Sequence, residues 1–143
     1  MNILFVCTGN TCRSPMAEGI LKSLNKDIDV CSRGLYVPDA TAPSYGSINA
    51  MEKMDIDISS HRSKQLTYAD CDDADLIITM TDSHKKTILQ ACESCSEKTF
   101  TLAEFAGEEG DISDPFGRDD NAYYECAKRI YSLILKADWG RKL

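Results

Sequence analysis

A cysteine and an arginine near the start of the chain have the spacing needed for covalent phosphoryl chemistry. Arg13 follows Cys7 by six residues, and Cys7 is the only one of the seven cysteines with an arginine at that offset. A cysteine thiolate is a strong nucleophile, and the planar guanidinium of an arginine can bind two phosphate oxygens at once. The pair therefore indicates a site where Cys7 attacks phosphorus while Arg13 holds the phosphoryl oxygens.

The residues around this pair predict an anion-binding loop. The apolar run Ile3-Leu4-Phe5-Val6 predicts a buried strand that ends at Cys7. Ser14 and Pro15 predict a helix start, with Ser14 as N-cap, Pro15 as the first helical residue and Glu18 in the first turn. A loop between a strand end and a helix N-terminus directs its backbone N–H groups inward, where they bind phosphate and favour a thiolate.

The loop residues between Cys7 and Pro15 also have predicted roles. Gly9 and Asn10 are suited to left-handed backbone, and the Ser14 hydroxyl can donate to the Cys7 sulfur. An alternative is that Cys7 is merely a small buried residue ending a strand, but this leaves Gly9, Asn10 and Arg13 unexplained. The candidate substrate-binding residues of the loop are Thr8, Gly9, Asn10, Thr11, Cys12 and Ser14.

Over essentially its whole length the chain resembles the low-molecular-weight protein tyrosine phosphatases, and within them the bacterial protein-arginine-phosphatase branch. The resemblance rests on residues 7–18, Cys-Thr-Gly-Asn-Thr-Cys-Arg-Ser-Pro-Met-Ala-Glu, and on Asp114-Pro115-Phe116-Gly117. Ser32-Arg33-Gly34 and His61-Arg62-Ser63-Lys64-Gln65-Leu66 are weaker matches. The resemblance implies one phosphatase domain over residues 1–143. It also implies a phosphocysteine intermediate, phosphorylated proteins as substrates, and neither a cofactor nor a metal.

Asp114 is the candidate for proton transfer. It belongs to the only Asp-Pro pair in the chain. The resemblance implies that its carboxyl group protonates the leaving group and later acts as a base toward water, the role of a general acid–base catalyst. The alternative is an ordinary turn, because Asp-Pro-Phe-Gly is also favourable turn chemistry.

Thr11 is the residue that bears most on substrate choice. The resemblance implies a branched aliphatic residue at this position in tyrosine-specific relatives, whereas Thr11 adds a hydroxyl able to meet a guanidinium nitrogen. Tyr36 can stack on a ring or on a guanidinium. A phenylalanine directly after Asp-Pro, here Phe116, resembles the arginine-phosphatase branch. We therefore expect phosphoarginine as the substrate, with phosphotyrosine as the alternative.

Three further cysteines allow other chemistry. The resemblance implies that Cys12 forms a reversible disulfide with Cys7, although it could equally be a small residue filling the loop. Cys92-x-x-Cys95 has no second ligand pair to complete a zinc site. A thiol-dependent arsenate reductase is a further alternative, but those enzymes carry a cysteine directly after the central strand, where this chain has Met80-Thr81.

The two histidines are expected to have supporting positions. His61 is predicted to order the phosphate loop through hydrogen bonds. His84 is predicted to be a solvated helix residue.

Composition narrows the class of protein. The net charge of −7 disfavours nucleic acid and anionic membranes as partners. There is no apolar run long enough to span a membrane and no export signal, so we expect a cytoplasmic protein. Seven cysteines, an odd number, then indicate reduced thiols rather than a disulfide framework. Composition leaves the oligomeric state open.

Strand and helix patterns alternate along the chain. Strands are predicted at 2–7, 29–31, 75–80 and 98–102, with a loop from 33 to 43. Helices are predicted at 14–25, 44–54, 82–92 and 119–136. This alternation predicts a single α/β domain with an open parallel sheet of about four strands and helices on both faces. The phosphate-binding loop would follow the first strand, at the carboxyl edge where such sheets bind ligands.

Overall fold

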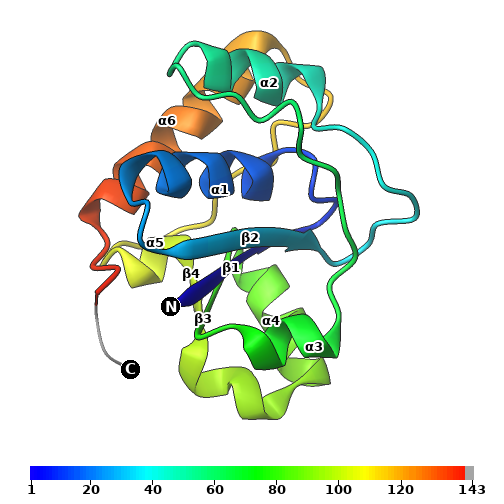
Figure 1. The fold of residues 1–143 in the computed structure, drawn as a ribbon, viewed down its shortest axis with the longest axis vertical. Coiled ribbons are helices and arrows are strands. Elements are labelled where there is room, and N and C mark those ends of the chain that lie inside the picture. The colour runs from blue at the N-terminus through cyan, green and yellow to red at the C-terminus, as the bar shows by residue number, and fades with distance from the viewer. Residues whose placement is uncertain (141–143) are drawn as a thin grey trace.

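Four parallel strands form the centre of the protein, as the computed structural model shows for residues 1–140 (Figure 1). The strands are β1 (Asn2–Cys7), β2 (Asp29–Gly34), β3 (Leu76–Thr79) and β4 (Thr99–Thr101), in the order β2-β1-β3-β4. All neighbouring pairs are parallel. The predicted fold class is therefore confirmed.

Helices cover both faces of this sheet (Figure 1). One layer contains α1 (Arg13–Leu24), α2 (Tyr45–Glu52) and α6 (Asp120–Lys136), and the other contains α3 (Tyr68–Asp73) and α4 (Asp82–Ala91). The short helix α5 (Leu102–Phe105) and a 3₁₀ segment, η1 (Glu93–Lys98), flank β4. Side chains of β1 alternate between the layers: Ile3, Phe5 and Cys7 pack on the α1 side, Leu4 and Val6 on the other. In residues 1–140 we find no helix of the length and apolarity that a membrane crossing requires.

The first helix begins two residues earlier than its sequence signals indicate. Arg13 is the first helical residue and Cys12 the N-cap, without a side-chain capping bond. Ser14, predicted as the cap, instead lies inside the first turn, where its hydroxyl makes the predicted contact with the Cys7 sulfur. Leu24, the last residue of the helix, is exposed.

Several bounds are set by tertiary pairing. β2 continues to Gly34, beyond the predicted end at residue 31, because it pairs with β1 up to the Cys7 position. The helices α3 and α5 were not predicted, although both start with a capping box. Thr67 and Asp70 form the first, and Thr101 and Glu104 the second.

Two cysteines depart from the predicted reduced state. Cys92 and Cys95 form a disulfide at the end of α4, with a Cα–Cα distance of 5.6 Å. Their separation along the chain and the turn after α4 bring them within bonding range. The prediction of reduced thiols was therefore wrong for this pair, while the free cysteines are Cys7, Cys12, Cys31, Cys71 and Cys126.

Candidate active site

The phosphate loop lies at the carboxyl edge of the sheet, between β1 and α1. Cys7 ends β1 and is 2% exposed. Asn10 has a φ of +57°, so the predicted left-handed residue is confirmed there. For Gly9 the prediction was wrong, since its φ is not in the left-handed region. A Cβ at Gly9 would meet only the Thr11 hydroxyl, at 3.8 Å, so its backbone conformation does not require glycine.

A directed pair of hydrogen bonds reaches the Cys7 sulfur. The Asn10 side-chain amide donates to Ser14 Oγ at 2.8 Å, and Ser14 Oγ lies 2.9 Å from Cys7 Sγ. Because an amide nitrogen can only donate, Ser14 accepts from Asn10 and keeps its own proton for the sulfur. The arrangement stabilises a negative charge on Cys7.

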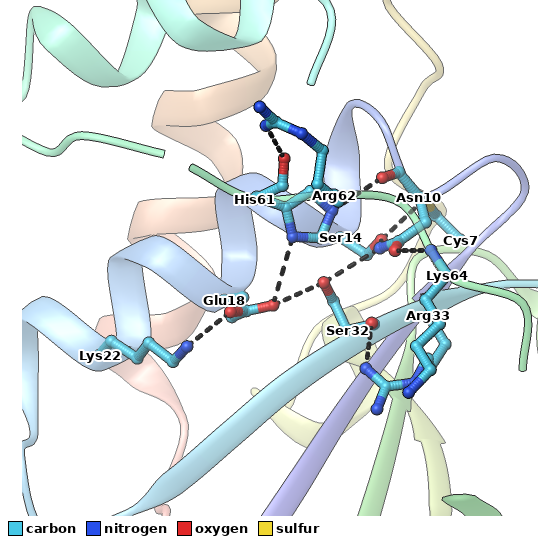
Figure 2. Close-up of polar contacts among 10 residues, drawn as sticks. All are labelled: Cys7, Asn10, Ser14, Glu18, Lys22, Ser32, Arg33, His61, Arg62 and Lys64. Carbon is cyan, nitrogen blue, oxygen red and sulfur yellow. Dashed lines mark hydrogen bonds and ion pairs between the residues drawn. The ribbon is translucent and has the colours of Figure 1, made fainter. Parts of the chain in front are cut away.

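Asn10 is itself held from several directions (Figure 2). Its amide also donates to Ser32 Oγ at 3.0 Å, and Ser32 in turn donates to Glu18 at 2.6 Å. Lys64 donates its backbone N–H to Asn10 Oδ1 at 3.0 Å. His61 Nε2 lies 3.0 Å from the Asn10 carbonyl, so the predicted ordering role of His61 is confirmed. Glu18 lies beyond the first turn of α1, where its carboxylate anchors this network rather than capping the helix.

The end of β2 packs directly on the phosphate loop. A Cβ at Gly34 would lie 2.9 Å from the Thr8 carbonyl oxygen and 3.0 Å from Asn10 Cβ, so only glycine permits this approach. The next residues bond to the loop, with Tyr36 donating its N–H to the Thr8 carbonyl at 2.9 Å. Tyr36 is 72% exposed. β2 therefore fixes the backbone that presents Tyr36 next to the loop.

Arg13 is buried, with 5% exposure. One terminal nitrogen donates to the Ile112 carbonyl at 2.9 Å, and the other lies 3.5 Å from Asp114 Oδ2. Arg13 Nε has no hydrogen-bond partner within residues 1–140. The guanidinium is thus oriented by the protein while one donor stays available for an oxyanion.

The segment from Asp114 to Gly117 is both a turn and a part of this site. Asp114 Oδ1 accepts the Phe116 N–H at 3.0 Å, and Gly117 has a φ of +79°. The turn chemistry expected of Asp-Pro-Phe-Gly is present, and the same turn brings Asp114 Oδ2 to Arg13. The Asp114 side chain is 51% exposed and Phe116 is 70% exposed.

Thr11 and Cys12 lie where the loop meets α2. The Thr11 carbonyl accepts the Ser44 N–H at 2.9 Å, while its hydroxyl is 3.8 Å from the Cys12 sulfur. Cys12 is a buried free thiol that contacts Ser44 Oγ at 3.2 Å and donates to the Tyr123 oxygen at 3.9 Å. It fills the underside of the loop, one of its two predicted roles, and a reversible disulfide with Cys7 stays a prediction.

His84 was predicted to be solvated, and this was wrong. The residue is 6% exposed, and its Nε2 lies 2.9 Å from Thr8 Oγ1. Burial, followed by the nearby Arg13 charge, lowers the pKa of His84 to about 4, so the ring is neutral near pH 7. A signal existed in the sequence, because His84 and the buried Ile88 are four residues apart on one helix face.

Three other free thiols do not compete as nucleophiles. Burial raises the pKa of Cys31 and Cys71, and it raises that of Cys126 to about 12. These three residues stay protonated near neutral pH. Among residues 1–140, no cluster of three His, Cys, Asp or Glu side chains is arranged to hold a metal ion.

Comparison with known proteins agrees with this geometry. Residues 2–136 match the family described as low molecular weight phosphotyrosine protein phosphatase. The low molecular weight protein-tyrosine-phosphatase PtpB of Staphylococcus epidermidis is 41% identical over 136 residues, or 95% of this chain and 96% of that protein. A protein-arginine-phosphatase of Geobacillus stearothermophilus is 37% identical over 134 residues, or 92% and 90%. The solved YwlE arginine phosphatase of the same organism superposes with a TM-score of 0.90 at 36% identity, covering 94% of this chain and 88% of that one. The chain therefore belongs to the low molecular weight phosphotyrosine protein phosphatase family.

Proposed function

We propose that this cysteine-dependent phosphatase hydrolyses phosphoarginine in proteins through a phosphocysteine intermediate. The Thr11 hydroxyl carries the choice of substrate. Within residues 1–140 its hydrogen-bond contact is the distant Cys12 sulfur, at 3.8 Å, so its oxygen is available to accept a guanidinium N–H. An alkyl group there would leave that N–H unpaired, at a cost of about 1–3 kcal/mol.

The first half of the reaction transfers the phosphoryl group to Cys7. The thiolate attacks phosphorus, the P–N bond breaks, and Asp114 donates its proton to the departing guanidine nitrogen. Arg13 stabilises the charge on the phosphoryl oxygens, since its Nε has no protein partner and its terminal nitrogens are already oriented.

The second half releases phosphate. Asp114, now ionised, takes a proton from water as the water oxygen attacks phosphorus, and the P–S bond breaks. The leaving group is the Cys7 thiolate, which Ser14 stabilises by donating its hydroxyl proton over 2.9 Å. The protons balance, because Asp114 loses one proton in the first half and regains one from water in the second.

Asp114 also supports phosphoarginine as the substrate. Its half-exposed carboxyl group lies beside Arg13, where it can contact a guanidinium nitrogen as well as deliver a proton. The guanidinium of phosphoarginine, in which the N–P bond replaces one of the five N–H groups of arginine, keeps several donors in a planar fork that matches carboxylate oxygens. A phenolic leaving group offers a single oxygen and no donor for this contact.

Phosphotyrosine is the second candidate because two exposed aromatic rings occupy segments adjoining the loop. Tyr36 is 72% exposed and Phe116 is 70% exposed. Such rings stack on a phenyl group as readily as on a guanidinium. They support a pocket for a flat substrate side chain, whereas Thr11 and Asp114 favour a polar one.

The arsenate reductase alternative is disfavoured by the position of Cys92 and Cys95. Both belong to the core on the α3 and α4 side of the sheet, whereas Cys7 packs on the α1 side. A relay from Cys7 to either residue would have to cross the sheet. We also propose a cytoplasmic location, because the free thiols Cys7 and Cys12 fit a reducing compartment.

Matched peptides test the proposal. Peptides of one sequence that carry either phosphoarginine or phosphotyrosine should be compared by kcat/KM. We expect phosphoarginine to be preferred by about 10-fold or more, the effect of one buried polar contact. Cys7→Ser should abolish turnover of both peptides, since a serine hydroxyl is a far weaker nucleophile. A preference for phosphotyrosine would replace the proposal with the second candidate.

A further inference from the structure

His84 lies outside the phosphate loop but contacts it. Its Nε2 is 2.9 Å from the hydroxyl of Thr8, the residue directly after Cys7. We propose that His84 is a positioning residue that orients the Thr8 hydroxyl so that its proton can be donated to a bound phosphoryl oxygen. This inference deepens the proposed function and rests on it.

The two ring nitrogens of His84 differ in their partners, and this difference decides which atom is the donor in the contact with Thr8. His84 Nδ1 is buried without a partner in residues 1–140. Buried N–H groups without a partner are rarer than buried acceptors without one, so the proton of the neutral ring belongs on Nε2. Nε2–H then donates to Thr8 Oγ1. The Thr8 hydroxyl accepts that bond and keeps its own proton for another acceptor.

Local structure explains why the histidine reaches the loop. β3 ends at Thr79, and α4 starts at Asp82 with Thr81 as its cap. The Thr81 hydroxyl accepts the backbone N–H of His84 at 3.1 Å, which fixes the first turn. Ile88, one turn further and 2% exposed, anchors the same helix face in the core. The ring is therefore held by α4, independently of the phosphate loop.

The charges around the ring keep it neutral. Burial and the Arg13 guanidinium disfavour a second proton, while Asp111 and Asp114 favour one. The first two effects are larger, and the pKa of His84 is lowered to about 4. A neutral ring avoids placing a second buried cation next to Arg13. It also preserves the single-donor geometry that the orientation of Thr8 requires.

A double-mutant cycle between His84 and Thr8 tests the inference. His84→Leu removes the donor, and Thr8→Val removes the hydroxyl while keeping the branched shape. We expect each change to lower kcat/KM and to raise the inhibition constant of inorganic phosphate by about 3- to 10-fold, the effect of one hydrogen bond. In the Thr8→Val background, His84→Leu should add less than 2-fold.

Two further variants separate positioning from general support of the fold. His84→Gln retains a side-chain N–H and should return phosphate inhibition to within about 2-fold of the wild type, whereas His84→Leu should not. Ser83→Ala changes the exposed neighbouring residue and should leave activity and melting temperature unchanged. An equal loss from His84→Leu with and without the Thr8 hydroxyl would overturn the inference. So would an unimpaired Thr8→Val.

Ring nitrogen NMR gives a readout that needs no turnover. Spectra of the wild type at pH 7 should show His84 protonated at Nε2 only, and Thr8→Val should shift that nitrogen signal. Protonation at Nδ1 would overturn the inference. Failure of the proposed function is recognised separately, because it appears as turnover by Cys7→Ser or as a preference for phosphotyrosine, and neither result affects phosphate inhibition or the ring spectrum.

Discussion

Asp114 Oδ2 lies 3.5 Å from a terminal nitrogen of Arg13, although the two residues come from opposite ends of the chain. The Arg13 side chain is 6% exposed and that of Asp114 is 51% exposed, so the carboxyl group lies on the solvent side of the guanidinium. A phosphoryl group held by Arg13 would therefore have the proposed proton donor, Asp114, next to it. This contact joins the start of α1 to the turn before α6.

Asp114→Asn should separate catalysis from turn formation. Asparagine can still accept the Phe116 N–H, so the turn should persist, but it cannot donate a proton to a leaving group. We expect kcat on phosphoarginine to fall by about 10²- to 10⁴-fold. An activated aryl phosphate, which needs little protonation, should lose much less. If both substrates lost activity equally, Asp114 would be assigned a structural role.

Arg13→Lys should show that a planar fork is required. Lysine keeps the charge but cannot bind two phosphoryl oxygens while also donating to the Ile112 carbonyl. We expect kcat/KM to fall by about 10²-fold or more, as when one transition-state donor is removed. Melting temperature serves as the control for folding. Retention of more than a tenth of the activity would contradict the role given to Arg13.

Thr11→Ile tests the residue proposed to determine substrate choice. Isoleucine keeps the branched shape of threonine, and the backbone bond from Ser44 to the Thr11 carbonyl is unaffected. The ratio of kcat/KM for phosphoarginine over phosphotyrosine should fall by about 10- to 100-fold. This ratio cancels general damage to the loop. Equal losses on both peptides would mean that Thr11 only supports the loop.

Acid should destabilise the protein partly through His84. The pKa of His84 is lowered by burial to about 4, below its ordinary 6.5. Between these values the unfolded chain binds a proton that the folded protein does not, so stability is present above pH 6.5 and is lost as pH falls toward 4. The free energy of unfolding should fall by about 3 kcal/mol from this group between pH 7 and pH 4. Denaturant titrations of wild type and His84→Gln from pH 7 to pH 4 measure this contribution as the difference in free energy of unfolding between the two proteins. If both proteins lost the same stability as the pH fell, His84 would make no such contribution.

Reduction of the Cys92–Cys95 disulfide should leave phosphatase activity within about 2-fold, because the pair lies in the core across the sheet from Cys7. Alkylation of the denatured Cys7→Ser protein, followed by mass spectrometry, should detect two additional thiols after treatment with a dithiol. Cys92→Ser, which cannot form the disulfide, is the matched control for activity. A large activity change in that variant would show that the end of α4 influences the active site.

The sequence by itself determined the local features of this site. Apolar residues before Cys7, the helix signals after it and the Arg13 offset predicted a phosphate loop, and the structure has that loop between β1 and α1. Strand and helix periodicity also predicted the parallel sheet. These features depend on neighbours within a few residues, whose preferences can be read directly from residue type.

Only the tertiary structure decided which distant groups join the loop. The contact of the Ser14 hydroxyl with Cys7 was predicted, but its place inside the first turn of α1, where the Asn10 amide donates to the same hydroxyl, was not. His84 was expected in solvent and is buried against Thr8. A hydroxyl or an imidazole has several possible partners, and residue type alone does not rank them. The packing of β2 and α4 against the loop makes that choice, because it determines which partner comes within hydrogen-bonding distance.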